Sequence, residues 1–137
     1  MVLVDTPIWS IAYRRTKRTS RDQRIFEDWR NLVRVQRAVL IGPVRQEVLS
    51  GFSSAERYGV LRKTLRAFED LPVDIADYEL AAHFHNDCRR RGVQGSPTDF
   101  LICAVAKRMD SPVFTTDGDF KRYAKFTDVR LYDSTRA

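Results

Sequence analysis

The stretch SPTDFLICAVA, residues 96–106, decides the fold, because it joins a helix start to a long apolar helix. Ser96 suits the N-cap and Pro97 the first helical position, while Asp99 completes a capping-box pattern with Ser96. From Phe100 to Ala106 every residue is apolar, so the helix has no side suited to water. We therefore expect this helix to be buried in the middle of the fold.

On both sides of this stretch, short apolar segments alternate with helical patterns, which is typical of a parallel α/β sheet covered on both faces. No repeat or linker interrupts the 137 residues, so we expect one domain spanning 1–137. Strands are predicted at 2–4, 38–41, 72–75, 113–116 and 129–132. Further helices are predicted from a Thr6 N-cap, from a capping box at 20–23, and at 43–50, 55–69, 78–91 and 120–126.

The charge balance favours polyanionic partners: 24 basic residues oppose 18 acidic ones, giving a net charge of +6. Basic residues cluster at 14–24, 89–91 and 121–125, and although any one cluster can be a solvated helix face, three together indicate a phosphate-backbone footprint. Our candidate RNA-binding residues are Arg14, Arg15, Lys17, Arg18, Lys121 and Arg122.

The N-terminal residues lack the features of a signal peptide, and no apolar run approaches the ~20 residues that cross a bilayer. We therefore expect a cytoplasmic protein with no membrane contact. Cys88 and Cys103 lie within apolar helical patterns, which favours buried free thiols over a zinc site.

Five acidic residues occupy positions that an α/β fold brings to one edge. Asp5 ends the first predicted strand, Glu47 lies one turn into the helix after the second, and Asp99 lies in the first turn of the apolar helix. Asp117 and Asp119 follow the fourth strand. Ligands of such sheets bind beyond the carboxyl ends of the strands. Clustered carboxylates need cations, and hard oxygen ligands without His or Cys select Mg²⁺ or Mn²⁺.

Each acid also has a local explanation that needs no ligand. Asp99 can serve the capping box, Asp117 an Asx-turn, and Asp119 the N-cap of the next helix. The grouping of all five at predicted strand ends in a basic protein favours the metal site over five separate local roles.

Four segments, in this order, resemble the successive motifs of PIN-domain proteins and especially of VapC toxins: V-L-V-D-T at 2–6, E-V-L-S-G at 47–51, S-P-T-D-x-x-I-C-A-V-A at 96–106, and V-F-T-T-D-G-D-F at 113–120. The resemblance covers nearly the whole chain. It implies a three-layer α/β/α fold with a central parallel sheet of order 3-2-1-4-5. It also implies that Asp5, Glu47, Asp99 and Asp117 are catalytic and bind metal, with Asp119 as an auxiliary acid. It further implies RNA cleavage, a cognate VapB-type antitoxin and a homodimer.

The chain departs from the family pattern at Pro7, where a hydroxyl residue is common two positions after the first Asp. Thr6 or Thr116 can supply the missing hydroxyl, and all the acids remain. We expect an in-line displacement at a phosphodiester with water as the nucleophile, assisted by one or two metal ions.

Two other functional classes with acidic α/β sites require residues that this sequence lacks. A phosphoacceptor signalling module needs an acidic pair near the first strand and a Lys after the last, and a D-x-D phosphatase needs a second Asp where Pro7 stands. Neither pattern is present. A PIN nuclease of RNA processing shares the chemistry and differs in regulation, and a non-catalytic RNA-binding PIN domain remains the other alternative.

Overall fold

The computed structural model describes residues 1–14 and 17–133. Its sheet consists of three short parallel strands, β1 (Val2–Val4), β2 (Ala38–Val39) and β3 (Val113–Phe114), in the order β2-β1-β3. Leu3 of β1 pairs with Val39 on one side and with Val113 on the other. All three residues of β1 are buried, which accounts for the unbroken apolar run at the start of the chain.

Beyond the three strands, single parallel bridges join Leu40 to Asp70 and Val113 to Leu131. The parallel α/β class is confirmed, and the order differs from the predicted 3-2-1-4-5 only in that the two outer positions hold bridges and not strands. The strand predicted at 72–75 fails for two local reasons. Pro72 has no backbone N–H to donate, and Asp74 caps the following helix in a reciprocal capping box with Asp77.

Seven helices surround this sheet among the described residues. They are α1 (Thr6–Tyr13), α2 (Ser20–Arg34), α3 (Gly42–Ser50), α4 (Ala55–Leu65), α5 (Ile75–Arg90), α6 (Pro97–Arg108) and α7 (Asp119–Thr127). The apolar helix α6 begins as predicted, with the Ser96 side chain accepting the Asp99 N–H at 3.1 Å. Every residue from Phe100 to Ala106 is buried, and α6 packs on α5, α7 and β3. The expected burial of this helix is confirmed.

Three predicted helix ends are shifted by local hydrogen bonds. Asp5, not Thr6, is the N-cap of α1, and Thr19, not Ser20, is the N-cap of α2. Helix α4 ends at Leu65 and not at residue 69, because the Arg45 guanidinium binds the carbonyl oxygens of Leu65 and Phe68. A cationic side chain thereby satisfies carbonyl groups at the end of the helix.

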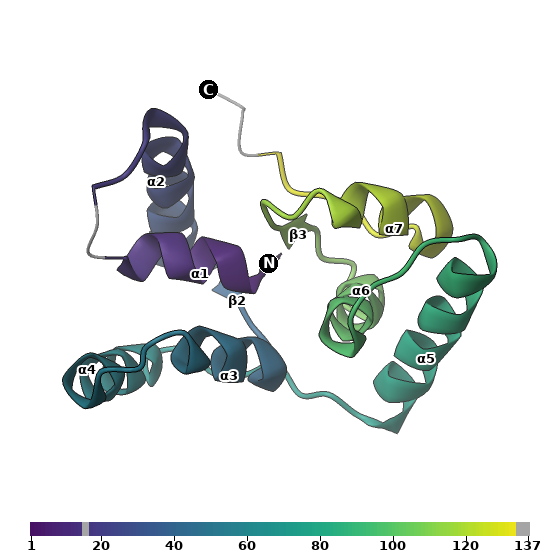
Figure 1. The fold of residues 1–137 in the computed structure, drawn as a ribbon, viewed down its shortest axis with the longest axis horizontal. Helices are drawn as coiled ribbons and strands as arrows, with labels where there is room; N and C mark the ends of the chain where they lie inside the picture. Colours follow the sequence, from purple (N-terminus) through teal and green to yellow (C-terminus); the bar gives the residue numbers. More distant parts are fainter. Residues whose placement is uncertain (15–16, 134–137) are drawn as a thin grey trace.

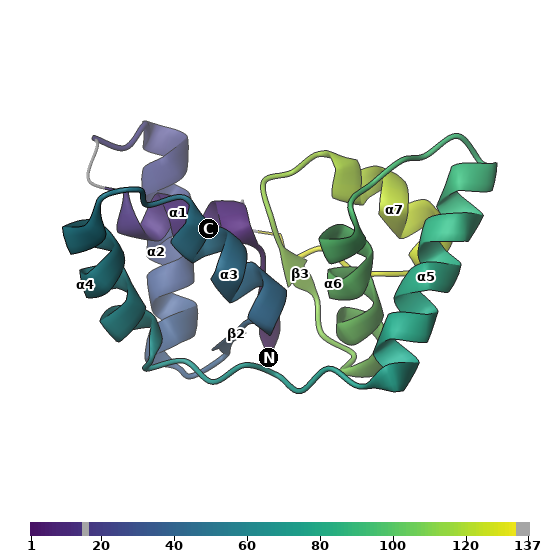
Figure 2. The ribbon, with the colours of Figure 1, turned by 60° about the horizontal axis from the view of Figure 1, so that its bottom comes forward.

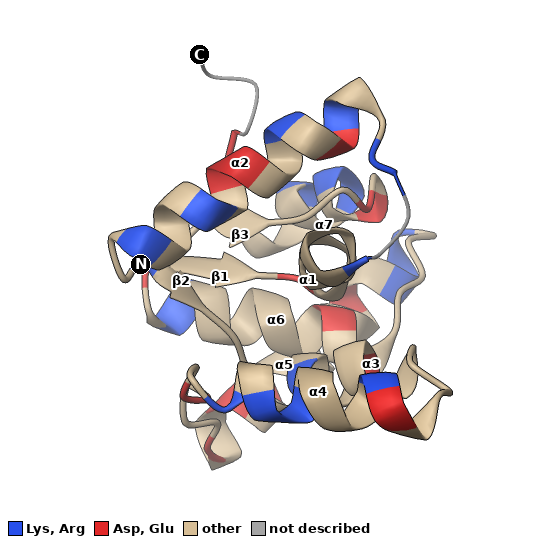
Figure 3. Ribbon diagram, turned by 90° about the vertical axis from the view of Figure 1, so that its left-hand side faces the viewer, with Lys and Arg blue, Asp and Glu red and all other residues tan. Residues whose placement is uncertain are grey.

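The helices form a layer on each side of the sheet. In Figure 3, α2 lies above the strands and α6 below them, with α3, α4 and α5 also on the lower side. Figure 1 shows α1 to α4 on one side of the view and α5 to α7 on the other. The segment 66–74 connects α4 to α5 along the edge of the molecule (Figure 2). Segments from both halves of the chain thus meet where β1 runs into α1.

Candidate functional site

Asp5 is buried at the junction of β1 and α1, with only 4% of its surface exposed. Its carboxylate accepts two hydrogen bonds, from the Thr6 N–H at 2.8 Å and from the Thr115 hydroxyl at 2.8 Å. The pKa of Asp5 is nevertheless raised from 3.8 to about 6, mainly by burial and also by the nearby charges of Asp99 and Glu47, which together outweigh the two hydrogen bonds. This carboxylate is therefore held in an environment that disfavours its own charge.

Glu47 approaches this position from α3. The Thr6 hydroxyl, at the start of α1, donates to its Oε2 atom at 2.7 Å, which joins α1 to α3 next to Asp5. Glu47 itself is exposed, so it lies on the open side of the site. Thr6 is thus one of three described hydroxyl groups that donate to the acids, with those of Thr115 and Tyr123.

Asp99 lies in the first turn of α6 and is half-buried. The Tyr123 hydroxyl of α7 donates to its Oδ2 atom at 2.8 Å. Burial raises the pKa of Asp99, hydrogen bonds from Tyr123 and Ser96 lower it, and the charges of Asp117 and Glu47 raise it. Asp99 is thus engaged with another helix, which a purely local capping role does not require.

The loop after β3 is organised by Thr115, which sequence reasoning missed. The Thr115 hydroxyl donates to Asp5 Oδ2 and accepts the Asp117 N–H at 3.0 Å, whereas no described hydrogen bond joins the Thr116 side chain to these carboxylates. Asp117 Oδ1 in turn accepts the Asp119 N–H at 2.9 Å, which forms the Asx-turn that the sequence allows at Asp117. Asp119 does not cap α7, since Gly118 is the N-cap.

Four of the five predicted acids are linked by their charges: those of Asp99 and Glu47 raise the pKa of Asp5, and those of Asp117 and Glu47 raise the pKa of Asp99. Figure 3 shows acidic ribbon segments where β1 meets α1 and on α6 next to it. Within residues 1–14 and 17–133, however, no three Asp, Glu, His or Cys side chains are gathered closely enough to hold one ion in this arrangement. Asp119 lies at the rim, in an ion pair with Arg122.

The donor set matches the chemistry of Mg²⁺ and Mn²⁺. All four acids offer carboxylate oxygens, and both described cysteines are buried free thiols, as predicted. A divalent cation among these groups would offset the repulsion between carboxylates that, after burial, raises the pKa of Asp5 and Asp99.

The predicted RNA-binding residues differ in their surroundings. Arg18 donates to the carbonyl oxygens of Ile11 and Ala12 and lies 3.8 Å above the Phe26 ring, so it has a structural role at the end of α1. Arg14 pairs with Asp22 at 3.3 Å. Lys17, Lys121 and Arg122 are exposed, and Arg15 lies outside the described residues.

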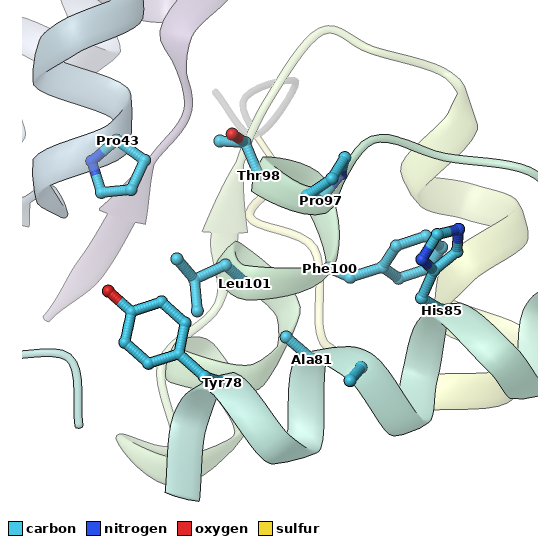
Figure 4. A pocket seen from close by; sticks show the side chains of 9 residues that line it. Pro43, Tyr78, Ala81, His85, Pro97, Thr98, Phe100 and Leu101 are labelled. Carbon is cyan, nitrogen blue, oxygen red and sulfur yellow. The ribbon is translucent and has the colours of Figure 1, made fainter. Parts of the chain in front are cut away.

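An apolar pocket of about 380 Å³ lies apart from the acids, between α5 and α6. Figure 4 shows Tyr78 and His85 of α5 facing Pro97 and Leu101 of α6, with Pro43 of α3 across the opening. None of the five acids lines this pocket, so it is a separate surface feature. Along residues 1–14 and 17–133, no helix is both long and apolar enough to span a bilayer.

Both the sequence and the fold of this chain are similar to those of known proteins. The family model of the PIN domain matches residues 2–126, while no curated protein matches the sequence. Among solved structures, FitAcB from Neisseria gonorrhoeae aligns over 100% of both chains with a TM-score of 0.78 and 22% identity. VapBC2 from Rickettsia felis, bound to a promoter DNA fragment, aligns over 96% of this chain and 98% of that one, with a TM-score of 0.73 and 16% identity.

VapBC-5 from Mycobacterium tuberculosis, a member of the VapBC family of toxin-antitoxin systems, aligns over 95% of both chains, with a TM-score of 0.66 and 18% identity. At these identities the likeness to solved structures shows a shared fold. The family model covers most of the chain, and the resemblance read from the four motifs is thereby confirmed. The chain belongs to the PIN-domain family.

Proposed function

We propose that this protein is an endoribonuclease dependent on Mg²⁺ or Mn²⁺, acting as the toxin of a type II toxin–antitoxin pair in the cytoplasm. One observation carries the proposal: the buried carboxylate of Asp5 has Asp99 and Glu47 as its charged neighbours. Burying like charges together costs free energy unless a cation is part of the design. Membership of the PIN family supports the nuclease assignment.

In this proposal Asp5, Glu47, Asp99 and Asp117 hold the metal, and Asp119 assists from the rim. A bound Mg²⁺ or Mn²⁺ would supply Lewis acidity and a water activated near neutral pH. The hydroxyl groups of Thr115 and Thr6 orient the carboxylates of Asp5 and Glu47. The exposed side chains of Lys17, Lys121 and Arg122 offset the repulsion between the acids and an RNA backbone.

The regulatory part of the proposal concerns an antitoxin of the VapB type, supported by solved relatives described as VapBC and FitAB assemblies. We expect an Arg of the antitoxin to pair with the carboxylates of the site. We also expect the apolar segment of the antitoxin to pack on the helices that carry Trp9 and Trp29, whose own rings are buried and pack edge to face. A shallow groove lined by Tyr13, Phe52 and Val60, among others, offers apolar contact between α1 and α4.

The homodimer expected from the resemblance is also part of the proposal. Ile75 and Tyr78, at the start of α5, are 78% and 56% exposed, and Tyr78 continues into the apolar pocket of Figure 4. Large exposed apolar side chains beside an apolar pocket are typical of protein–protein contacts. An Ile75→Glu, Tyr78→Glu variant should therefore sediment as a smaller species than the wild type.

Expression in a bacterial host separates toxin from processing nuclease. The wild-type chain expressed alone should arrest growth, and Asp5→Asn should not, because it removes a ligand at nearly constant volume. Co-expression with the neighbouring small open reading frame should restore growth, and its product should co-purify. A wild-type chain that cleaves RNA in vitro but leaves growth unaffected would make the processing nuclease the better assignment. A chain that binds RNA without cleaving it would leave only the non-catalytic alternative.

A further inference from the structure

Tyr123 lies at the back of the site, where a buried phenol meets one of its carboxylates. Its side chain is fully buried in α7, and its hydroxyl donates to Asp99 Oδ2 at 2.8 Å. A phenol has an O–H to donate and a carboxylate only accepts, so Tyr123 is the donor in this pair.

The tyrosine ring has little freedom to move away from this position. It packs against Phe100 of α6 with ring centroids 4.9 Å apart, and edge to face against Phe120 at 5.1 Å. On the side of the loop between α5 and α6, Gly95 closes the space. A Cβ atom added to Gly95 would lie 2.7 Å from the Cζ atom and 2.9 Å from the Cε1 atom of Tyr123.

Gly95 is therefore required here because its backbone passes directly over the phenol. Real Cβ atoms are essentially never found this close to other atoms, so even an alanine would force the ring or the loop to shift. The glycine and the two phenylalanines together fix where the Tyr123 hydroxyl points. Neither Gly95 nor Tyr123 belongs to a sequence motif that would predict this role.

We propose that Tyr123, whose ring lies against Gly95, is a positioning residue for Asp99. Its hydroxyl binds the Oδ2 atom of Asp99, so that the Oδ1 atom of Asp99 faces the divalent cation. This inference rests on the proposed function, because it assigns a partner to one of the proposed ligands. Hydrogen-bonded partners of metal ligands typically change metal affinity by about 10- to 100-fold when they are removed. The same range is expected for the loss of this hydroxyl.

The test measures Mn²⁺ affinity directly, from the electron paramagnetic resonance signal of free Mn²⁺, and so does not depend on RNA cleavage. Tyr123→Phe removes the hydroxyl and keeps the ring, and we expect it to weaken Mn²⁺ binding by about 10-fold or more. Tyr132→Phe is the matched control, because Tyr132 packs on Phe114 and makes no described side-chain contact with the acids. Its affinity should stay within about twofold of the wild type.

Gly95→Ala provides an independent variant that keeps the hydroxyl but displaces it, and its Mn²⁺ affinity should fall as well. Melting of the metal-free variants identifies the folded ones, on which the affinity is read. Wild-type affinity in folded Tyr123→Phe would overturn the inference and leave the metal site intact. If the wild type itself binds no Mn²⁺, the proposed function fails first and this inference fails with it.

Discussion

Two buried carboxylates of this protein stand at helix starts in opposite electrostatic surroundings. Asp77, at the start of α5 and 1% exposed, accepts two hydrogen bonds from the Arg108 guanidinium, at 2.6 and 2.8 Å. That interaction lowers the pKa of Asp77. Asp5, at the start of α1 and almost as buried, has a raised pKa and other carboxylates as its charged neighbours.

The difference distinguishes a buried carboxylate that stabilises the fold from one that, under the proposed function, serves a metal site. A buried carboxylate with its own guanidinium is complete and ties α5 to α6. A buried carboxylate among other carboxylates keeps a charge without a cationic partner, and under the proposed function a divalent cation supplies that partner. Position at a helix start, which both residues share, does not distinguish the two, but the sign of the pKa shift and the identity of the neighbours do. The following predictions test this contrast, from the largest expected effect to the smallest.

The largest effect should come from exchanging each carboxylate for its amide. Asp5→Asn and Asp99→Asn should lower RNA cleavage by about 100-fold or more while the chain remains folded, because a ligand is lost at nearly constant volume. Asp77→Asn should do the reverse: it should cost about 3 kcal/mol of stability by leaving Arg108 without its partner, and the folded fraction should still cleave RNA. Denaturant melts and single-turnover cleavage of a labelled RNA distinguish the two. Full cleavage by Asp99→Asn would return that residue to helix capping alone.

The second prediction concerns pH in the metal-free protein. The pKa of Asp5 is about 6 in the folded state against 3.8 for the free side chain, so the folded chain binds the extra proton between these values. Its contribution to the free energy of unfolding therefore falls as the pH rises through that window, by about 3 kcal/mol in total. For Asp77 the lowered pKa gives the opposite sign, with stability lost as the solution is acidified below the ordinary carboxylate range.

The measurement is the difference in unfolding free energy between the wild type and Asp5→Asn at several pH values without metal. The free energy of unfolding of Asp5→Asn should rise relative to that of the wild type as the pH rises from about 4 to 6. A constant difference across that range would show that Asp5 ionises normally in the folded protein.

A smaller effect is expected at Thr115, whose hydroxyl supports Asp5. Thr115→Val keeps the shape and removes the hydrogen bond, so cleavage should fall by about 10-fold. Thr116→Val is the matched control and should cleave as the wild type does. Equal losses in the two variants would remove Thr115 from the support of the site.

The smallest effect is expected at Asp119, which lies at the rim in an ion pair with Arg122. Because solvent screens this carboxylate, Asp119→Asn should lower cleavage only several-fold, leaving partial activity. A loss as deep as that of Asp5→Asn would make Asp119 a full member of the ligand set.

Much of this arrangement could be predicted from the sequence where local chemistry and apolar patterns agree. The apolar helix behind Ser96 and the buried start of the chain follow from composition alone. The edge strands could not be predicted, because Pro72 and the capping residue Asp74 compete locally with strand pairing that depends on distant partners. The acids could be named as a group, but the choice of Thr115 over Thr116 depends on which side chain faces Asp5.

Tyr123 could not be predicted as part of the site, because it lies 24 residues after Asp99 and on a different helix. In the sequence, Tyr123 reads only as one apolar position of a short helix. Trp9 and Trp29 likewise occupy positions in helical patterns, and in the structure both form part of the core. The roles of Tyr123, Trp9 and Trp29 follow from their burial, and burial depends on how the whole chain packs.

The central claim, that these carboxylates form a metal site, is tested most directly by melting the protein with and without metal. Wild-type protein treated with EDTA should gain several degrees in melting temperature in millimolar Mg²⁺ or Mn²⁺, because a cation that binds only the folded state stabilises it by mass action. Asp5→Asn should lose most of this gain, and Asp77→Asn should keep it. A wild-type melting temperature that EDTA and millimolar metal leave equal would contradict the account.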